Sequence, residues 1–303
     1  VEAEPLYREA IELQRELPGG DNRYLPHMLR EYGQLMIGKG DPVTAEPLML
    51  EAIDLFRKDY GDNHLTVGAA YESLASLYEN LGDLQKAEAS YRKAVEIFDR
   101  SPQTSAALKM DAFLHLSGVL TEEKKYDDAE RLIDQAMALY RDVPDRSEST
   151  LSQLVIQSSL IAFRKQDYVK AVTQAEEAVA GARRARTGMN LQTELANSLE
   201  NQGFILTNTD KPVQAEPLLR ESLAIKKATN PKGHPAIASV MSFLGDCLTK
   251  QRRFREAEAL LIESDEDLRS TMVEQNPRRV ESRQRLVKLY EAWGKPDLAA
   301  RYR

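Results

Sequence analysis

Residues 87–94 read Ala87-Glu88-Ala89-Ser90-Tyr91-Arg92-Lys93-Ala94, and related stretches recur along the whole chain. An alanine, usually followed by glutamate, returns every 42 residues, with a single step of 44. We call these residues the marker alanines: Ala3, Ala45, Ala87, Ala129, Ala171, Ala215, Ala257 and Ala299. A fixed period of roughly 20 to 50 residues is typical of repeat proteins, in which each unit packs only on its neighbours. The sequence therefore predicts a repeat array rather than one globular core.

The apolar residues of one unit have helical spacing. Between residues 67 and 81 they recur at steps of three and four, and a second stripe follows between 84 and 98. Gly82-Asp83 interrupts the pattern, which predicts helix, short turn, helix, longer turn. Small residues twelve positions before the marker alanines would let the two helix backbones approach closely. These are Gly33, Ala75, Ser117, Ser159, Gly203 and Gly245.

The pattern Tyr71-x2-Leu74-Ala75-x2-Tyr78, followed by Ala87-x3-Tyr91 and Ala94, resembles the tetratricopeptide repeat. The longer period, with Ala-Glu-Pro-Leu and Gly-x-x-His motifs, is similar to the repeats of kinesin light chains. Gly61-Asp62-Asn63-His64 carries the second motif, and Lys232-Gly233-His234-Pro235 carries a variant with glycine directly before the histidine. The resemblance implies an all-α fold, an α-solenoid of antiparallel helix pairs wound as a right-handed superhelix.

Counting repeats predicts a single array over residues 1–303, with about six full repeats and partial repeats at both ends. We expect 1–17 to be the second helix of a cut repeat, 24–270 to hold six helix pairs, and 278–303 to form a terminal helix and the start of its partner. First helices are expected near 24–39, 66–81, 107–123, 150–165, 192–208, 236–251 and 278–293. A longer loop is expected beside Arg183–Gly188. Because the chain begins inside a repeat without an initiator methionine, we interpret it as a fragment of a longer protein.

The overall composition excludes several classes of partner. The net charge is −7 and the pI is near 5.4, so the chain lacks the basic surface that nucleic-acid phosphates require. No run of about 18 apolar residues is present, which predicts no membrane span. The single cysteine, Cys247, excludes an internal disulfide framework and favours a reducing, cytoplasmic location.

No catalytic or metal-binding pattern stands out. The histidines are His27, His64, His115 and His234, and none has metal-ligand spacing to another histidine or to Cys247. Two of them fall in expected turns, which favours a turn or surface role. Cys247 falls on the packed helix face, where an inert buried thiol is expected. We therefore predict no metal, no cofactor and no enzymatic activity.

The resemblance implies that the first helix of each pair lines a concave groove that binds peptides. Spacing from the small residues places an apolar strip at its centre, formed by Leu114, Ile156, Leu160, Phe163 and Phe204. Acidic residues are expected around that strip: Glu72, Glu79, Asp111, Glu122 and Glu200. An apolar strip with a charged rim is typical of a peptide site. The predicted partner is a peptide with large apolar anchors and flanking Lys or Arg. Alternatively, the first helix of the fourth pair, near 150–165, packs deeper than the others. Its apolar face then belongs to the core and not to a groove.

A second candidate surface is basic. It comprises Arg183, Arg184, Arg186, Lys226 and Lys227, and it would suit an acidic partner. The alternative is that these cations complement helix dipoles, since basic residues recur in the last turn of each second helix.

Together these patterns predict a non-enzymatic scaffold that binds a protein or peptide. One alternative is a regulatory or substrate-recruiting region of a larger bacterial serine/threonine kinase, because residues 286–296 look like the repeat-bearing tail of such kinases. Another is a structural array that associates with itself through apolar faces exposed at its cut ends.

Overall fold

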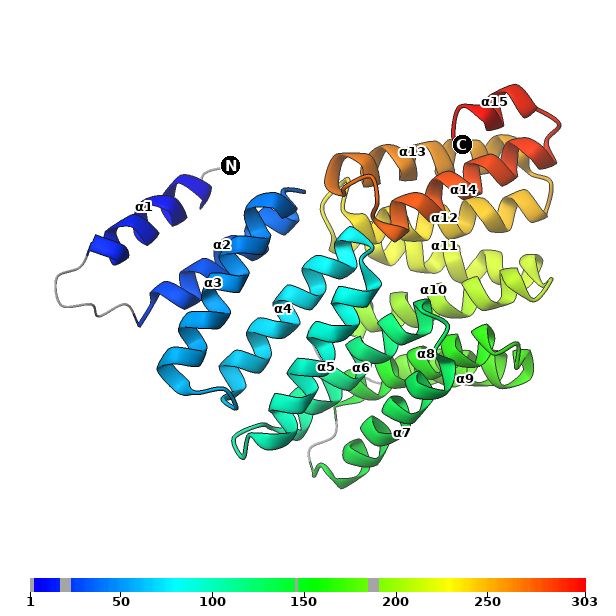
Figure 1. Cartoon of the computed structure of the whole chain (residues 1–303). Helices are drawn as coiled ribbons and strands as arrows, with labels where there is room; N and C mark the ends of the chain where they lie inside the picture. Colours follow the sequence, from blue (N-terminus) through cyan, green and yellow to red (C-terminus); the bar gives the residue numbers. More distant parts are fainter. Residues whose placement is uncertain (1–2, 17–22, 145–146, 185–190) are drawn as a thin grey trace. The chain divides into compact units, whose positions relative to one another are not determined.

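The computed structural model describes residues 3–16, 23–144, 147–184 and 191–303. Within these ranges the regular structure consists of fifteen α-helices, and no strand occurs (Figure 1). The chain divides into two compact units, Val1–Glu123 and Lys124–Arg303, which we call unit 1 and unit 2 and describe separately.

Unit 1 contains α1 (Ala3–Glu16), α2 (Leu25–Gly38), α3 (Pro42–Tyr60), α4 (Leu65–Leu81), α5 (Leu84–Arg100) and α6 (Ala106–Glu122). Unit 2 contains α7 (Tyr126–Asp142), α8 (Glu148–Arg164), α9 (Tyr168–Arg184), α10 (Leu191–Asn208), α11 (Pro212–Thr229), α12 (Pro235–Lys250), α13 (Phe254–Thr271), α14 (Pro277–Ala292) and α15 (Pro296–Ala300). We call the even-numbered helices inner and the odd-numbered helices outer.

The helices pack as the repeat pattern predicts. Within each unit an inner helix packs on the outer helix that follows it, as α4 does on α5 and α10 on α11, and outer helices pack on the next inner helix. All seven inner helices begin within two residues of the expected positions. The prediction of an all-α solenoid of antiparallel pairs is therefore confirmed. That both units continue as a single array stays a prediction.

Small residues set the spacing between inner and outer helices. A Cβ atom added to Gly203 would lie 2.5 Å from Cγ of Leu219, and one added to Gly245 would lie 2.5 Å from Cγ of Leu261. Ordinary contacts between carbon atoms are roughly 3.5–4.0 Å. The leucine therefore occupies the space that a larger inner residue would need.

The turns between paired helices share one backbone geometry. Each contains a residue with positive φ, and these residues follow the repeat period: Gly40, Gly82, Lys124, Gln166, Asp210, Arg252 and Gly294. Glycine adopts this conformation freely, whereas other residues pay roughly 1–2 kcal/mol. Four of the seven positions are not glycine, and at three of them, Gln166, Asp210 and Arg252, packing of the helix pair holds the turn in place.

The Gly-x-x-His motifs have a structural explanation. His64 and His234 are the N-cap residues of α4 and α12. Their Nδ1 atoms accept hydrogen bonds from the backbone N–H groups of Thr66 (3.3 Å) and Ala236 (3.2 Å). An N-cap satisfies a backbone donor that the helix itself leaves unpaired. The expected turn role of these two histidines is therefore confirmed.

The glutamates that follow the marker alanines connect neighbouring repeats. Each lies within the first five residues of its outer helix, and five of the six contact the end of the next inner helix. The pairs are Glu4 with Lys39, Glu46 with Tyr78 (2.7 Å), Glu130 with Lys165 (2.7 Å), Glu216 with Gln251 (3.1 Å), and Glu258 with Tyr290 (3.0 Å). The recurrence of glutamate therefore reflects a polar contact between successive repeats.

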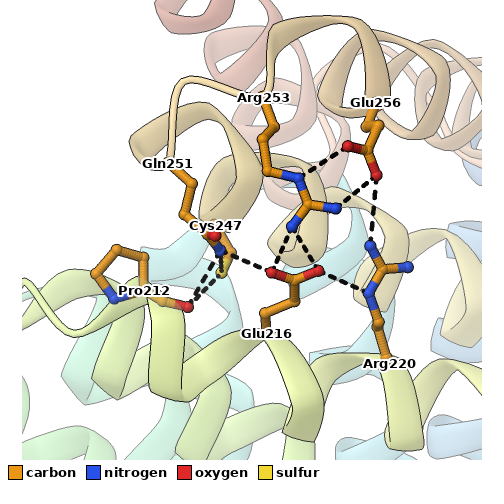
Figure 2. A network of polar contacts seen from close by, with 7 residues as sticks. All are labelled: Pro212, Glu216, Arg220, Cys247, Gln251, Arg253 and Glu256. Atoms are coloured by element: carbon orange, nitrogen blue, oxygen red, sulfur yellow. Dashed lines mark hydrogen bonds and ion pairs between the residues drawn. The ribbon is translucent and has the colours of Figure 1, made fainter.

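Figure 2 shows the most extensive of these contacts. Glu216 on α11 accepts hydrogen bonds from Arg253 Nη1 (2.6 and 2.7 Å), Arg220 Nε (2.8 Å) and Gln251, while Arg253 also binds Glu256. Burial raises the pKa of the Glu216 carboxyl, but the hydrogen bonds from the two arginines outweigh it, so the pKa is lowered overall. Glu216 therefore stays ionised and joins α11 to the start of α13.

Cys247 lies beside this network and is fully buried. Its thiol donates to the carbonyl oxygen of Pro212 at 3.1 Å. Burial raises the pKa of the thiol, which disfavours the reactive thiolate. The prediction of an inert, buried cysteine agrees with this environment.

The two ends of the chain differ. Leu286 and Tyr290 of α14 are buried, and Tyr302 stacks on Tyr290 with ring centroids 5.8 Å apart. These apolar residues of α14 are therefore covered by the chain itself, and self-association through the ends stays a prediction. On α1, Leu6 and Leu13 are 65% and 59% exposed.

Candidate functional site

Three phenylalanines from successive inner helices of unit 2 form a row of contacting rings, which we call the phenylalanine ladder. Phe163 of α8 lies 5.3 Å from Phe204 of α10, and Phe204 lies 5.2 Å from Phe243 of α12, measured between ring centroids. The interplanar angles of 70° and 53° are close to the edge-to-face arrangement that aromatic pairs prefer. All three rings are half-buried, so part of each remains on the surface.

Arg285 of α14 ends the ladder. Its guanidinium carbon lies 4.6 Å from the centroid of Phe243, the geometry of a cation–π contact. Nη1 donates to Ser242 Oγ and Nη2 donates to Glu281 Oε2, both at 3.0 Å. These contacts fix the guanidinium against the last ring.

The structure brings two of the predicted groove residues, Phe163 and Phe204, into direct contact. Ile156 and Leu160 lie on the same face of α8 as Phe163, two turns and one turn before it, and both are half-buried. This partial burial fits either a groove surface or the edge of a core. The assignment of Ile156 and Leu160 to a peptide groove stays a prediction.

Unit 1 holds five of the other six predicted groove residues. Glu79, Asp111 and Glu122 are exposed, whereas Glu72 and Leu114 are half-buried. Tyr91 of α5 donates to Glu79 Oε2 at 3.1 Å. The structure thus separates the two kinds of predicted groove residue: four of the five acids belong to unit 1, and four of the five apolar residues belong to unit 2.

His115 of α6 lies within this acidic group, which the sequence did not reveal. Its Nδ1 is 3.8 Å from Glu72 Oε1, and its ring lies 5.7 Å from that of Tyr91. The contact with Glu72 raises the pKa of the imidazole above its ordinary value of 6.5; burial opposes this, and the charges of Glu79 and Asp111 add to it. Asp111 is exposed by area, but partial desolvation of its carboxyl raises its pKa above 3.8.

These shifts predict how unit 1 responds to pH. A group whose folded pKa is raised contributes stability below its unfolded pKa, and that contribution is lost as the pH rises through the folded pKa. For His115 we therefore expect a stabilising contribution that is complete below about pH 6.5 and declines above it. NMR titration of the His115 ring should give a midpoint above 6.5, and Glu72→Gln should lower it.

Glu96→Gln is a matched control because it removes the same charge from α5, where Glu96 binds Lys93 at 3.0 Å. It should leave the His115 midpoint unchanged. A wild-type midpoint at or below 6.5 would contradict the effect of Glu72.

Glu200 and Lys226, which the sequence assigned to two different candidate sites, form an ion pair with each other. Their side chains are 11% and 6% exposed. Ser239 of α12 also donates to Glu200, at 2.6 Å. The pair therefore lies between α10, α11 and α12. Because both charges are buried and paired, neither Glu200 at the groove rim nor Lys226 in the basic patch is available to a ligand.

The predicted basic patch is further reduced. Arg183 forms an ion pair with Glu221 of the next outer helix at 2.7 Å. Arg184 and Lys227 are exposed, while Arg186 lies outside the described residues, as does most of the longer loop expected there. Of the five cations predicted for the basic patch, Arg184 and Lys227 are the two described residues that are exposed and take no part in these ion pairs.

Phe243 and Arg285 were missed because the ladder does not follow the repeat period. Phe163 lies 8 residues before its marker alanine, Phe204 lies 11 before its own, and Phe243 lies 14 before. Each ring has moved by three residues, nearly one helical turn, so it stays on the same face. A search for aromatic residues that lie three positions earlier in each successive repeat would have found the row.

Neither a metal site nor a membrane span emerges from the described part of the chain. No group of three or more His, Cys, Asp or Glu side chains there is arranged to hold a metal ion. Likewise, none of the described helices combines the length and apolar character needed to cross a membrane.

Comparison with protein families identifies the repeats. One family model described as "Tetratricopeptide repeat" matches residues 24–100 and 194–264, and a second with the same description matches 112–147. Together they cover more than half of the chain. The chain therefore belongs to the tetratricopeptide repeat proteins, as the sequence pattern indicated. No curated protein matches it by sequence.

Solved structures share the fold at low sequence identity. The Rap conjugation gene regulator of the plasmid pLS20, in complex with the Phr* peptide, gives a TM-score of 0.68 at 13% identity, covering 98% of this chain and 79% of its own. NprR in complex with its cognate peptide NprX gives 0.65 at 15% identity, covering 99% and 82%. BtubC (BKLC) from P. vanneervenii gives 0.53 at 17% identity, covering 80% and 91%. At these identities the similarity shows the fold alone.

Proposed function

We propose that this protein is a non-enzymatic scaffold that binds a peptide segment along the inner helices of unit 2. The observation that carries the proposal is the phenylalanine ladder, which presents half-buried aromatic rings from three successive inner helices. Aromatic residues that are partly desolvated in the free protein are typical anchors of peptide sites. Ile156 and Leu160 extend the apolar surface along α8.

A comparison supports this function, because two structures with the same fold, NprR and the pLS20 regulator, were solved with a peptide bound. Because Cys247 is a buried thiol in a disulfide-free chain, the proposed location is cytoplasmic.

The proposal predicts that displayed random peptides with large apolar side chains will be selected by the protein. Phe204→Ala should weaken the selected peptides roughly 30-fold, because truncating a central anchor costs about 2 kcal/mol. Val213→Ala is a control, since Val213 is 74% exposed at the start of an outer helix. Binding can be measured by fluorescence polarisation, with circular dichroism to confirm that both variants stay helical.

The proposal fails if no peptide is enriched, or if helical Phe204→Ala binds the selected peptides as tightly as Val213→Ala does. The two alternatives stay predictions. In the structure, Trp293 of the stretch that resembles a kinase tail stacks on Phe254 at 5.6 Å, which gives it a packing role.

A further inference from the structure

We propose that the ligand of the phenylalanine ladder carries a carboxylate next to its apolar anchor, and that Arg285 binds this carboxylate. The inference rests on the proposed function and adds the chemistry of the ligand and its direction. The apolar side chain would contact the rings of Phe204 and Phe243, and the carboxylate would lie on the α14 side of Phe243.

The position of Arg285 supports this inference. A guanidinium has five N–H donors in one plane. Ser242 and Glu281 engage one donor each, and the face of the group is covered by Phe243. The remaining donors lie at the edge of a stacked, pre-oriented guanidinium, and this planar edge matches the two oxygens of a carboxylate.

The charges around the ladder point the same way. The predicted acid of this region, Glu200, is neutralised by Lys226. The charged side chains of α12 and α14 comprise three carboxylates and six cations: Asp246, Glu281, Glu291, Lys250, Arg278, Arg279, Arg283, Arg285 and Lys288. Lys288 lies one turn after Arg285 and is exposed. The local excess of positive charge therefore favours an acidic ligand at this end.

The side chain of Arg285 is only 12% exposed, which distinguishes it from an ordinary surface arginine. A charge-assisted hydrogen bond made at a partly desolvated site is stronger than one made in open solvent. Arg283 offers a comparison on the same helix: it binds Glu274 of the preceding loop at 3.2 Å and is not part of the ladder.

The test uses peptides selected against the wild-type chain, measured on wild type, Arg285→Gln and the matched control Arg283→Gln. We expect acidic residues to be enriched beside the apolar anchor. Changing the acid to its amide should weaken binding to wild type and to Arg283→Gln about tenfold, and should have little effect on binding to Arg285→Gln. Peptides with an amidated C-terminus show whether the carboxylate is a side chain or the terminal group.

Arg285→Glu provides the converse measurement, because a new selection on this variant should enrich Lys or Arg at the same peptide position. If selected peptides need Phe204 but carry no acid, or if the amide change weakens binding equally in Arg285→Gln, the carboxylate inference is wrong while the peptide site remains. If no peptide is selected, or if helical Phe204→Ala binds undiminished, the proposed function itself fails.

Discussion

Lys226→Met is expected to lower the free energy of unfolding by about 3–5 kcal/mol, because it leaves the Glu200 carboxylate buried without its cation. Lys226 is 5% exposed and Glu200 is 9% exposed, so water does not replace the lost partner. Ser239 still donates to Glu200, but one hydroxyl does not compensate for a full charge. We expect the loss to concentrate in α10, α11 and α12, which surround the pair. Chemical denaturation and hydrogen exchange of the amides in these helices measure it.

Lys227→Met is the matched control, since Lys227 is the exposed neighbour on the same helix and should change stability by less than about 0.5 kcal/mol. The double variant Glu200→Leu/Lys226→Met removes both charges and should recover most of the loss, because well-packed apolar residues often replace a buried ion pair at little cost. A single-variant loss below about 1 kcal/mol would show that Glu200 is solvated.

Gly203→Ala is expected to destabilise the chain by about 1–3 kcal/mol, although alanine favours helix more than glycine does. The new Cβ would lie 2.5 Å from Cγ and 2.7 Å from Cδ2 of Leu219, so α10 and α11 must move apart. Gly245 and Leu261 repeat this pair, whereas the equivalent positions of another repeat hold a larger inner residue, Ser159, and a smaller outer one, Ala175. Thermal unfolding followed by circular dichroism measures the effect.

Gly181→Ala is the control within the same unit. A Cβ added there meets nothing within 4 Å, so only the helix propensity of alanine acts and we expect a gain of up to about 1 kcal/mol. Combining Gly203→Ala with Leu219→Ala should relieve the overlap, at the cost of a smaller core. Equal stability of Gly203→Ala and Gly181→Ala would mean that Leu219 moves aside freely.

The fold was predictable from sequence because two signals coincide. The marker alanines reveal the repeat length, and small residues such as Gly203 reveal where paired helices cross. Both signals arise from packing between neighbouring helices, and this packing recurs with the repeat period. The turns follow the same period even where Lys124 or Arg252 replaces glycine. The division into two units left no such signal, since residues around Glu123 keep the period.

The candidate site was only partly predictable. Phe163 and Phe204 stood out as apolar residues on an inner face, but the drift of the ladder by one turn per repeat hid Phe243. Spacing within one helix also cannot tell that Glu200 points toward α11 and α12, because Lys226 belongs to a different helix. Pairing between helices therefore decides which charges are available to a ligand.

The glutamates beside the marker alanines also bear on cooperativity. In a solenoid, the free energy that couples each repeat to its neighbour decides whether the array melts as one body or in segments. Five of these glutamates have a polar contact with the next inner helix, but in α9 the position is Val172, which packs against the same buried cluster as Phe163 and Phe204. The contact at this position is thus apolar, so it should weaken on cooling rather than with added salt, and it lies beside the surface proposed to bind peptide. A ligand bound to the phenylalanine ladder would then contact α8, α10 and α12 together and strengthen the coupling between their repeats.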